Sequence, residues 1–111
     1  MDEIEFDRVA RDELRRIEEA LADVDPDDVE LSGSDGVLKL DLRDGTKVVI
    51  NAHRAARQIW MAAVATAWHF DRGTDGAWRA ARSGEELSDT LDKILRERAG
   101  VAFTRARVGS P

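Results

Sequence analysis

The sequence has no cysteine, no tyrosine and only two prolines. Without cysteine, the chain can form no disulfide and no thiolate metal site, and it has no cysteine nucleophile. It also lacks a hydrophobic run approaching the roughly 20 residues that a membrane-spanning helix needs. The first residues, MDEIEF, are acidic where a targeting peptide would be basic. We therefore expect a cytoplasmic protein that does not bind membranes.

The remaining composition favours a single globular domain. The 111 residues are 42% hydrophobic and 36% charged, and a chain of this length buries roughly two-thirds of its unfolded surface. The sequence contains no internal repeat and no low-complexity segment. We expect one domain over residues 1–103, followed by a short, polar and unstructured tail over residues 104–111.

The negative charge is concentrated near the N-terminus. Residues 1–30 carry 13 acidic side chains and four arginines, a net charge of −9 against −6 for the whole chain. Such a pole repels nucleic acid and attracts cations or a basic protein surface, so we expect no nucleic-acid partner. Two acid–arginine pairs in this segment, Asp7 with Arg11 and Asp12 with Arg16, have the i,i+4 spacing of ion pairs on a helix.

The hydrophobic pattern predicts an amphipathic helix over residues 4–22. Apolar side chains recur there at every third or fourth position, at Phe6, Val9, Ala10, Ile17 and Leu21. Glu13 falls inside this stripe, where we expect it to lie at the margin or to be hydrogen-bonded. Pro26 ends the helical pattern, because proline disfavours the helical conformation in the residue before it.

From Gly36 the apolar residues alternate with polar ones, as in half-buried strands. The dipeptide Asp44-Gly45 predicts a hairpin with a type I′ turn, which needs positive φ at both residues. The expected strands are 36–42, 46–51, 58–63, 67–71 and 77–81. Because these strands follow one another through short turns, we expect an antiparallel meander.

A second helix is predicted near the C-terminal end. The segment from Ser83 to Glu86 reads as a capping box, Leu87 and Leu91 begin an apolar face, and Gly100 stands where a C-terminal cap would lie. The order of elements predicts an α+β fold, a two-layer α-β sandwich. In it, N- and C-terminal helices pack on one face of an antiparallel sheet of five to six strands, and the other face is open to solvent.

The sequence offers little for acid–base catalysis. It contains no recognisable catalytic motif, and its only histidines, His53 and His69, read as surface residues. Closely spaced carboxylates are a stronger signal, because hard cations such as iron prefer oxygen ligands. An EF-hand loop beginning at Asp23 is excluded, because Asp28 replaces the turn glycine and Ser34 the bidentate glutamate.

What remains is a series of acids that we call the acidic ridge. Its members are Glu18, Glu19, Asp23, Asp25, Asp27, Asp28 and Glu30. An exposed and flexible ridge of this kind should bind metal weakly and with little selectivity. The alternative is a solvated helix face that only keeps the domain soluble.

A third feature is Gln58-Ile59-Trp60-Met61. If these residues form a strand, burial of Ile59 and Met61 places Trp60 on the open face of the sheet. Trp60 would then be a protein-docking residue, because tryptophan and arginine dominate interface hot spots. The alternative is that Trp60 belongs to the core.

An ordered series of short motifs runs from Phe6 to Phe103, through nearly the whole chain. The motifs are F-x-R-x-A at 6–10, I-E-E at 17–19, G-V-L at 36–38, D-G-x-K-x-x-I-N at 44–51, Q-I-W at 58–60, H-F-D at 69–71, Trp78, and R-S-G-E at 82–85. Each motif alone is weak evidence, whereas their order and spacing together are specific. In these features the chain resembles the frataxin family, and most closely its bacterial, CyaY-type branch.

The resemblance implies a small α-β sandwich that binds Fe²⁺ and Fe³⁺ weakly through acids of its first helix and the loop after it. Carried over position by position, and with Glu3 and Asp7 added from the same helix, the expected metal ligands are Glu18, Glu19, Asp23, Asp25, Asp27, Glu3 and Asp7. The resemblance also implies an accessory factor of iron–sulfur cluster assembly. Such factors contact a PLP-dependent cysteine desulfurase, often with the scaffold protein present, and modulate the rate of cluster formation.

The partner-facing residues implied by the resemblance lie mainly on the sheet. The expected partner-binding residues are Asn51, Gln58, Trp60, Arg57, Glu18 and Glu19. His53 and Ala55, in the turn before Gln58, stand where the family usually has glutamine and proline.

Our leading interpretation is a regulator that is not an enzyme and that is monomeric unless metal induces oligomers. One alternative is a ferroxidase or iron-storage protein, which would need a fixed metal site that dispersed carboxylates do not supply. Another alternative is an acidic inhibitor that works without metal.

Overall fold

Six strands, each hydrogen-bonded to the next one in sequence, form one antiparallel sheet with the order β1-β2-β3-β4-β5-β6. This computed structural model describes residues 1–103, and the predicted tail over 104–111 lies outside the described residues. The elements are α1 Glu3–Ala20, β1 Val29–Ser34, β2 Val37–Leu42, β3 Lys47–His53, β4 Gln58–Ala63, β5 Thr66–Arg72, β6 Trp78–Ala80 and α2 Leu87–Ala99. The meander is therefore as expected, and the six strands fall within the expected five to six, although only five of them were located in the sequence.

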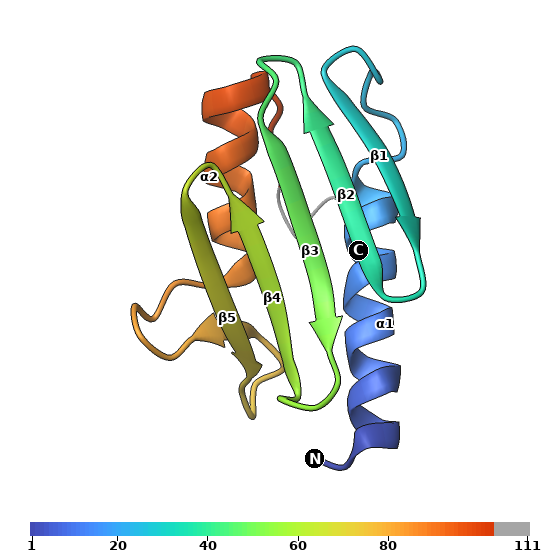
Figure 1. Ribbon diagram of the computed structural model, residues 1–111, viewed down its shortest axis with the longest axis vertical. Coiled ribbons are helices and arrows are strands. Elements are labelled where there is room, and N and C mark those ends of the chain that lie inside the picture. Colours follow the sequence, from blue (N-terminus) through green and yellow to red (C-terminus); the bar gives the residue numbers. More distant parts are fainter. Residues whose placement is uncertain (104–111) are drawn as a thin grey trace.

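Both helices cover the same face of the sheet, α1 behind the β1–β3 half and α2 behind β4 and β5 (Figure 1). The two-layer sandwich predicted from the sequence is thus confirmed. Apolar side chains of α1, α2 and the sheet form the core between the two layers. The largest fully buried ones are Phe6, Ile17, Leu38, Leu40, Ile50, Ile59, Met61, Phe70, Trp78, Leu87, Leu91 and Leu95. Within residues 1–103, no helix is long and apolar enough to cross a membrane.

The first helix begins at an Asp2 cap, whose carboxylate accepts a hydrogen bond from the Glu5 amide at 2.7 Å. Glu13 lies within the buried stripe and is only 3% exposed, rather than at the margin. Its carboxylate lies 3.6 Å from the guanidinium of Arg16, one turn further along. A buried carboxylate needs such a partner, because desolvation penalises an isolated charge.

The two ion pairs expected on α1 were wrong. Asp12 pairs with Arg15 at 3.9 Å instead of with Arg16, and Asp7 pairs with Arg54, which follows β3, instead of with Arg11. The second partner could not be read from helical spacing, because it comes from the sheet layer. Tertiary contact has overridden the local pairing.

The first strand, β1, was not predicted, and the type I′ turn was placed at the wrong dipeptide. Asp35 and Gly36 join β1 to β2 and both have positive φ, +49° and +80°, as a type I′ turn requires. At Asp44-Gly45 only the glycine has positive φ, and its amide donates to the Leu42 carbonyl at 2.9 Å. That turn is therefore a type I turn followed by a left-handed glycine, the usual three-residue hairpin loop.

The capping box expected at the second helix was also wrong. Glu86 has extended backbone and forms an isolated β-bridge with Arg79, so α2 begins one residue later, at Leu87. The Ser83 hydroxyl accepts from the Glu85 amide at 3.2 Å instead of from residue 86. The C-terminal cap is as predicted, because Gly100 adopts the left-handed conformation and donates to the Leu95 carbonyl.

Candidate functional site

The acids of the ridge are solvent-exposed except for Asp28, which is half-buried, and most of them are unpaired among residues 1–103. Glu18 and Glu19 lie on the last turns of α1, and Asp23, Asp25 and Asp27 follow in the loop to β1. Within residues 1–103, none of these five carboxylates is held in an ion pair, whereas Asp28 pairs with Arg43 at 3.2 Å. The ridge is therefore a continuous source of negative field at one end of the molecule.

The same acids do not converge on a point. Among the described residues, no group of three or more His, Asp or Glu side chains is placed to hold a metal ion. Asp25 accepts a hydrogen bond from the Asp27 amide at 2.9 Å, which shapes the loop rather than a ligand cage. Exposed carboxylate oxygens suit a hard cation chemically, but this arrangement suits weak and unselective binding.

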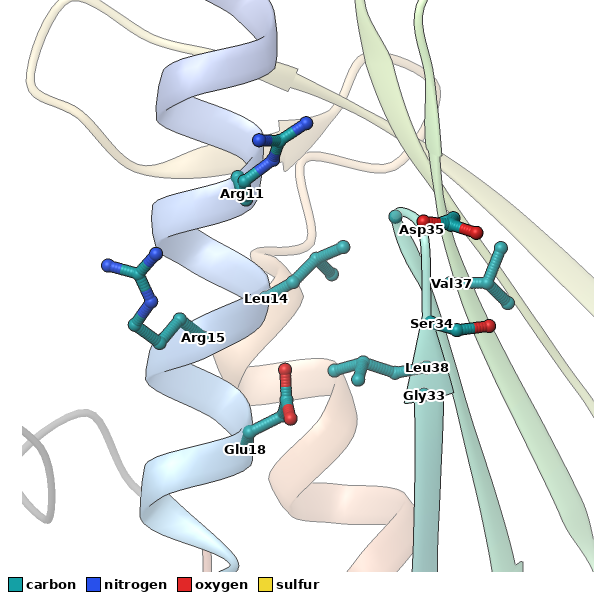
Figure 2. A pocket seen from close by; sticks show the side chains of 10 residues that line it. Arg11, Leu14, Arg15, Glu18, Gly33, Ser34, Asp35, Val37 and Leu38 are labelled. Carbon is teal, nitrogen blue, oxygen red and sulfur yellow. The ribbon is translucent and has the colours of Figure 1, made fainter.

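Glu18 lines a hollow of about 320 Å³ between α1 and the β1–β2 hairpin. Figure 2 shows its carboxylate directed into this hollow beside Leu14 and Leu38, whereas the guanidinium of Arg15 points away from the sheet. Arg11 lines the same hollow two turns earlier on the helix. A cation bound at Glu18 would therefore feel both an attractive carboxylate and a nearby positive charge, which lowers its affinity.

The two N-terminal metal candidates are already engaged by an arginine. The guanidinium of Arg54 lies 3.6 Å from the Glu3 carboxylate and 3.1 Å from the Asp7 carboxylate. Glu3 and Asp7 lie on the same helix as Glu18, but their ion pairs with Arg54 make them less available to a metal ion. The structure thus separates the seven expected metal ligands into five unpaired acids and two that are paired.

Three of the expected docking residues, Asn51, Gln58 and Trp60, lie on the open face of the sheet. Glu18 and Glu19 instead lie on α1, and Arg57 lies in the turn before β4. Trp60 is half-buried and alternates with the buried Ile59 and Met61, so it does not belong to the core. Asn51 is its direct neighbour across β3 and β4, and His69 is its direct neighbour across β4 and β5. Of the two alternatives that the sequence left open for Trp60, the structure has the indole on the open face.

Trp60 is held between two imidazole rings, which sequence reasoning missed. The ring centroids of His53 and Trp60 are 3.9 Å apart and those of Trp60 and His69 are 4.2 Å apart, with interplanar angles of 16° and 14°. We call His53, Trp60 and His69 the ring stack. Sequence reasoning placed His53 in the turn after a strand ending at residue 51, whereas β3 extends to His53. The register of the three strands could not be read locally.

Hydrogen bonds fix the surroundings of the ring stack. The Trp60 indole nitrogen donates to the Gln58 side-chain oxygen at 2.9 Å, and the Gln58 amide nitrogen donates to Asp71 at 3.1 Å. Arg57, in the turn before β4, donates to the backbone carbonyls of Met1 and Ala55. This arginine therefore ties the turn to the N-terminus as well as lying beside the docking face.

Comparison with known proteins points in one direction. A family model described as a frataxin-like domain matches residues 1–101. A protein of Ralstonia pickettii strain 12J, named iron-sulfur cluster assembly protein CyaY, is 38% identical over 109 residues, which cover 96% of each chain. A protein of the same name from Dechloromonas aromatica strain RCB is 39% identical over 104 residues, covering 93% of this chain and 97% of that one.

Solved structures agree with the sequence comparison. A frataxin from Psychromonas ingrahamii, studied for stability modulation within the CyaY protein family, superposes with a TM-score of 0.86 at 26% identity and covers 95% of this chain and 98% of its own. A trimeric frataxin from the yeast Saccharomyces cerevisiae, in its ferrous complex, superposes with a TM-score of 0.72 at 27% identity. The overlap there is 84% of this chain and 87% of the yeast chain.

Proposed function

The chain belongs to the frataxin-like domain family, and on that premise we propose that it is an accessory protein of iron–sulfur cluster assembly. In this proposal it binds Fe²⁺ and Fe³⁺ weakly through the acidic ridge and docks on a cysteine desulfurase, with the scaffold protein as a further partner. It regulates cluster formation and is not itself an enzyme. The two bacterial relatives described above carry the name of an iron–sulfur cluster assembly protein, which supports the general role.

The observation that carries the proposal is the set of five unpaired, exposed acids at the end of α1 and in the loop after it. Carboxylate oxygens are the ligands that hard cations prefer, so iron is a fitting cargo for the ridge. The dispersed geometry supports weak binding instead of turnover, because a catalytic metal site needs ligands held in a fixed arrangement. The ferrous complex of the related yeast protein is consistent with iron as the cargo.

Docking would use both surfaces of the molecule. The negative field of the acidic ridge steers a basic patch of the desulfurase into an encounter, and such steering acts mainly on the rate of association. Trp60 and its neighbours Asn51 and Gln58 then provide the contact on the open face, where a large side chain is already desolvated in part. The ridge and the open face thus have different roles in one complex.

The test is cluster formation by the cognate desulfurase and scaffold protein with wild type and with the double variant Glu18→Lys/Glu19→Lys. We expect the reversal to abolish most of the regulatory effect and to weaken binding more at low salt than at high salt. The matched control is Asp89→Lys/Glu97→Lys, which makes the same change of charge at exposed positions of α2. Equal regulation by wild type and the ridge variant would remove the ridge from the mechanism.

Oxygen consumption separates binding from catalysis. With Fe²⁺ in excess over protein, we expect no acceleration of oxygen uptake over buffer, because the described acids form no fixed centre. Sustained turnover would instead support a ferroxidase. Conversion of Asp23, Asp25 and Asp27 to asparagine tests the remaining alternative, since a metal-independent inhibitor would work unchanged after iron binding in the loop is lost.

A further inference from the structure

The ring stack leaves Trp60 with little freedom. His53 covers one face of the indole and His69 covers the other, and both contacts are close and nearly parallel. The indole N–H is also taken, because it donates to Gln58 at 2.9 Å. A partner can therefore neither stack on an indole face nor accept its N–H, and it meets only the exposed edge of the ring.

Each flanking ring is placed by the sheet. His69 lies directly opposite Trp60 across β4 and β5, and His53 lies on β3 diagonally across from it, two residues beyond Asn51. Diagonal neighbours on one face of an antiparallel pair lie within reach of aromatic side chains. The His53 ring is also tied to its own turn, because its Nδ1 accepts the Ala56 amide at 3.3 Å.

This bond fixes which nitrogen of neutral His53 carries the proton. Because Nδ1 is the acceptor, Nε2 carries the hydrogen and is left as a donor. On the other side of the stack, Asp71 holds Gln58, and Gln58 holds the indole. The stack is thus a rigid group with a defined donor, built on three adjacent strands and separate from the hydrophobic core.

We propose that His53 and His69 are positioning residues, which hold the Trp60 indole in one orientation so that the open face is preformed for the desulfurase. This inference rests on the proposed function, because it concerns the same docking face. The physical reason is that a side chain already ordered in the free protein loses less entropy on binding. His53 additionally determines specificity, because the partner segment must offer an acceptor, such as a backbone carbonyl or a carboxylate, to its Nε2–H.

The first experiment measures affinity for the desulfurase with full-length His53→Ala and His53→Phe. Loss of one stacked ring should weaken binding roughly three- to tenfold, the range expected for one aromatic pair. Phenylalanine restores the stack without the donor, so His53→Phe should recover part of this loss but not all of it. Ile4→Ala removes an exposed apolar side chain of α1, in the other layer, and should bind as wild type does.

The second experiment reads the orientation of Trp60 in the free protein by NMR. Its indole N–H resonance is assigned by its disappearance in Trp60→Phe. We expect this resonance to shift and broaden in His53→Ala, to remain sharp in His53→Phe, and to be unaffected in Ile4→Ala. A melting temperature close to wild type for His53→Ala would show that the effect is on the docking face and not on the fold.

The outcomes distinguish failure of the positioning role from failure of docking through the open face. If Trp60→Ala binds the desulfurase as tightly as wild type, docking through the open face is wrong, and the proposed function loses that surface. If Trp60→Ala binds weakly but His53→Ala binds as wild type does, the positioning role is overturned and the proposed function stands. If His53→Phe binds as tightly as wild type, the role of the Nε2–H donor in specificity is overturned and only the stacking role remains.

Discussion

Arg54 forms an ion pair with Asp7 at 3.1 Å and so ties the turn after β3 to the first helix. The same guanidinium lies 3.6 Å from Glu3. One side chain of the sheet layer therefore pairs with two N-terminal acids of α1, while Glu18 and Glu19 at the other end of the helix have no ion-pair partner among residues 1–103.

Arg54→Ala should extend metal binding towards the N-terminus of α1. With Glu3 and Asp7 released, two more carboxylates become available to a hard cation. In wild type we expect anaerobic Fe²⁺ to broaden amide resonances of residues 18–27, and in the variant we expect broadening at residues 3–7 as well. Arg82→Ala, at an exposed position after β6, is the control. Equal broadening of residues 3–7 in wild type would contradict the prediction.

Val64→Gly should raise stability. Val64 is the first residue of the two-residue loop between β4 and β5, its φ is +58°, and its side chain is 67% exposed. A β-branched residue is strained in this region, and the first position of such a loop favours glycine. Relief of the strain outweighs the entropy cost of glycine, so we expect a gain of about 1 kcal/mol in the free energy of unfolding.

The neighbouring residue supplies the control for this prediction. Ala65 does not have positive φ among the described residues, so Ala65→Gly gains no relief and only adds freedom to the unfolded chain. We expect it to lose about 0.5–1 kcal/mol. Chemical denaturation of both variants measures the two effects, and a loss of stability in Val64→Gly would disprove the strain at Val64.

Most elements of the fold could be predicted from the local sequence pattern, but β1 could not. The segment Val29–Ser34 has one buried residue, Val29, and its last three residues are exposed, because it is an edge strand. Its neighbours are acidic, so the charge pattern concealed the alternation of Val29 and Leu31. The Asp35-Gly36 dipeptide was the available signal, since it stands between two runs that alternate.

The candidate site likewise has some features that short stretches of sequence indicate and others that depend on tertiary structure. The exposure of the ridge acids was expected from short stretches of sequence, and the open-face orientation of Trp60 was one of the two alternatives that those stretches left open. The pairing of Arg54 with Glu3 and Asp7 depends on how the helix lies against the sheet. The ring stack depends on the register of three strands. Neither relationship can be predicted from the local sequence, because the partners are brought together only by tertiary structure.

Asp75 provides a prediction for pH dependence. The Arg79 guanidinium donates to its carboxylate at 2.9 and 3.1 Å, and this bond, with that from the Ala77 amide, lowers the pKa of Asp75 from 3.8 to about 2. A lowered folded-state pKa means that the contribution to stability is complete above about 3.8 and is lost as the pH falls towards about 2.

Titration of the Asp75 carboxyl carbon by NMR measures this directly. We expect the wild-type transition near pH 2, and in Arg79→Ala we expect it to move back towards higher pH, because the main cause of the shift is removed. An unchanged Asp75 transition in Arg79→Ala would show that the backbone bond from Ala77 is responsible instead.

Added monovalent salt should raise the melting temperature. Residues 1–30 carry a net charge of −9, and five acids of the ridge have no ion-pair partner among residues 1–103. Their mutual repulsion is strong at 0.01 M salt, where the Debye length is about 30 Å, and is largely screened at 1 M, where it is about 3 Å. Screening also weakens the ion pairs of the structure, but exposed pairs contribute only about 0–1 kcal/mol each.

The double variant Glu18→Lys/Glu19→Lys shows whether the repulsion arises at the ridge. Two reversals change the local charge by four units, so the rise in melting temperature with sodium chloride should be smaller than in wild type, and the variant should melt higher at low salt. Asp89→Lys/Glu97→Lys changes the total charge equally, away from the ridge. If both variants respond alike, total charge and not its concentration at α1 sets the salt dependence, and a fall in the wild-type melting temperature with salt would mean that attractive pairs dominate.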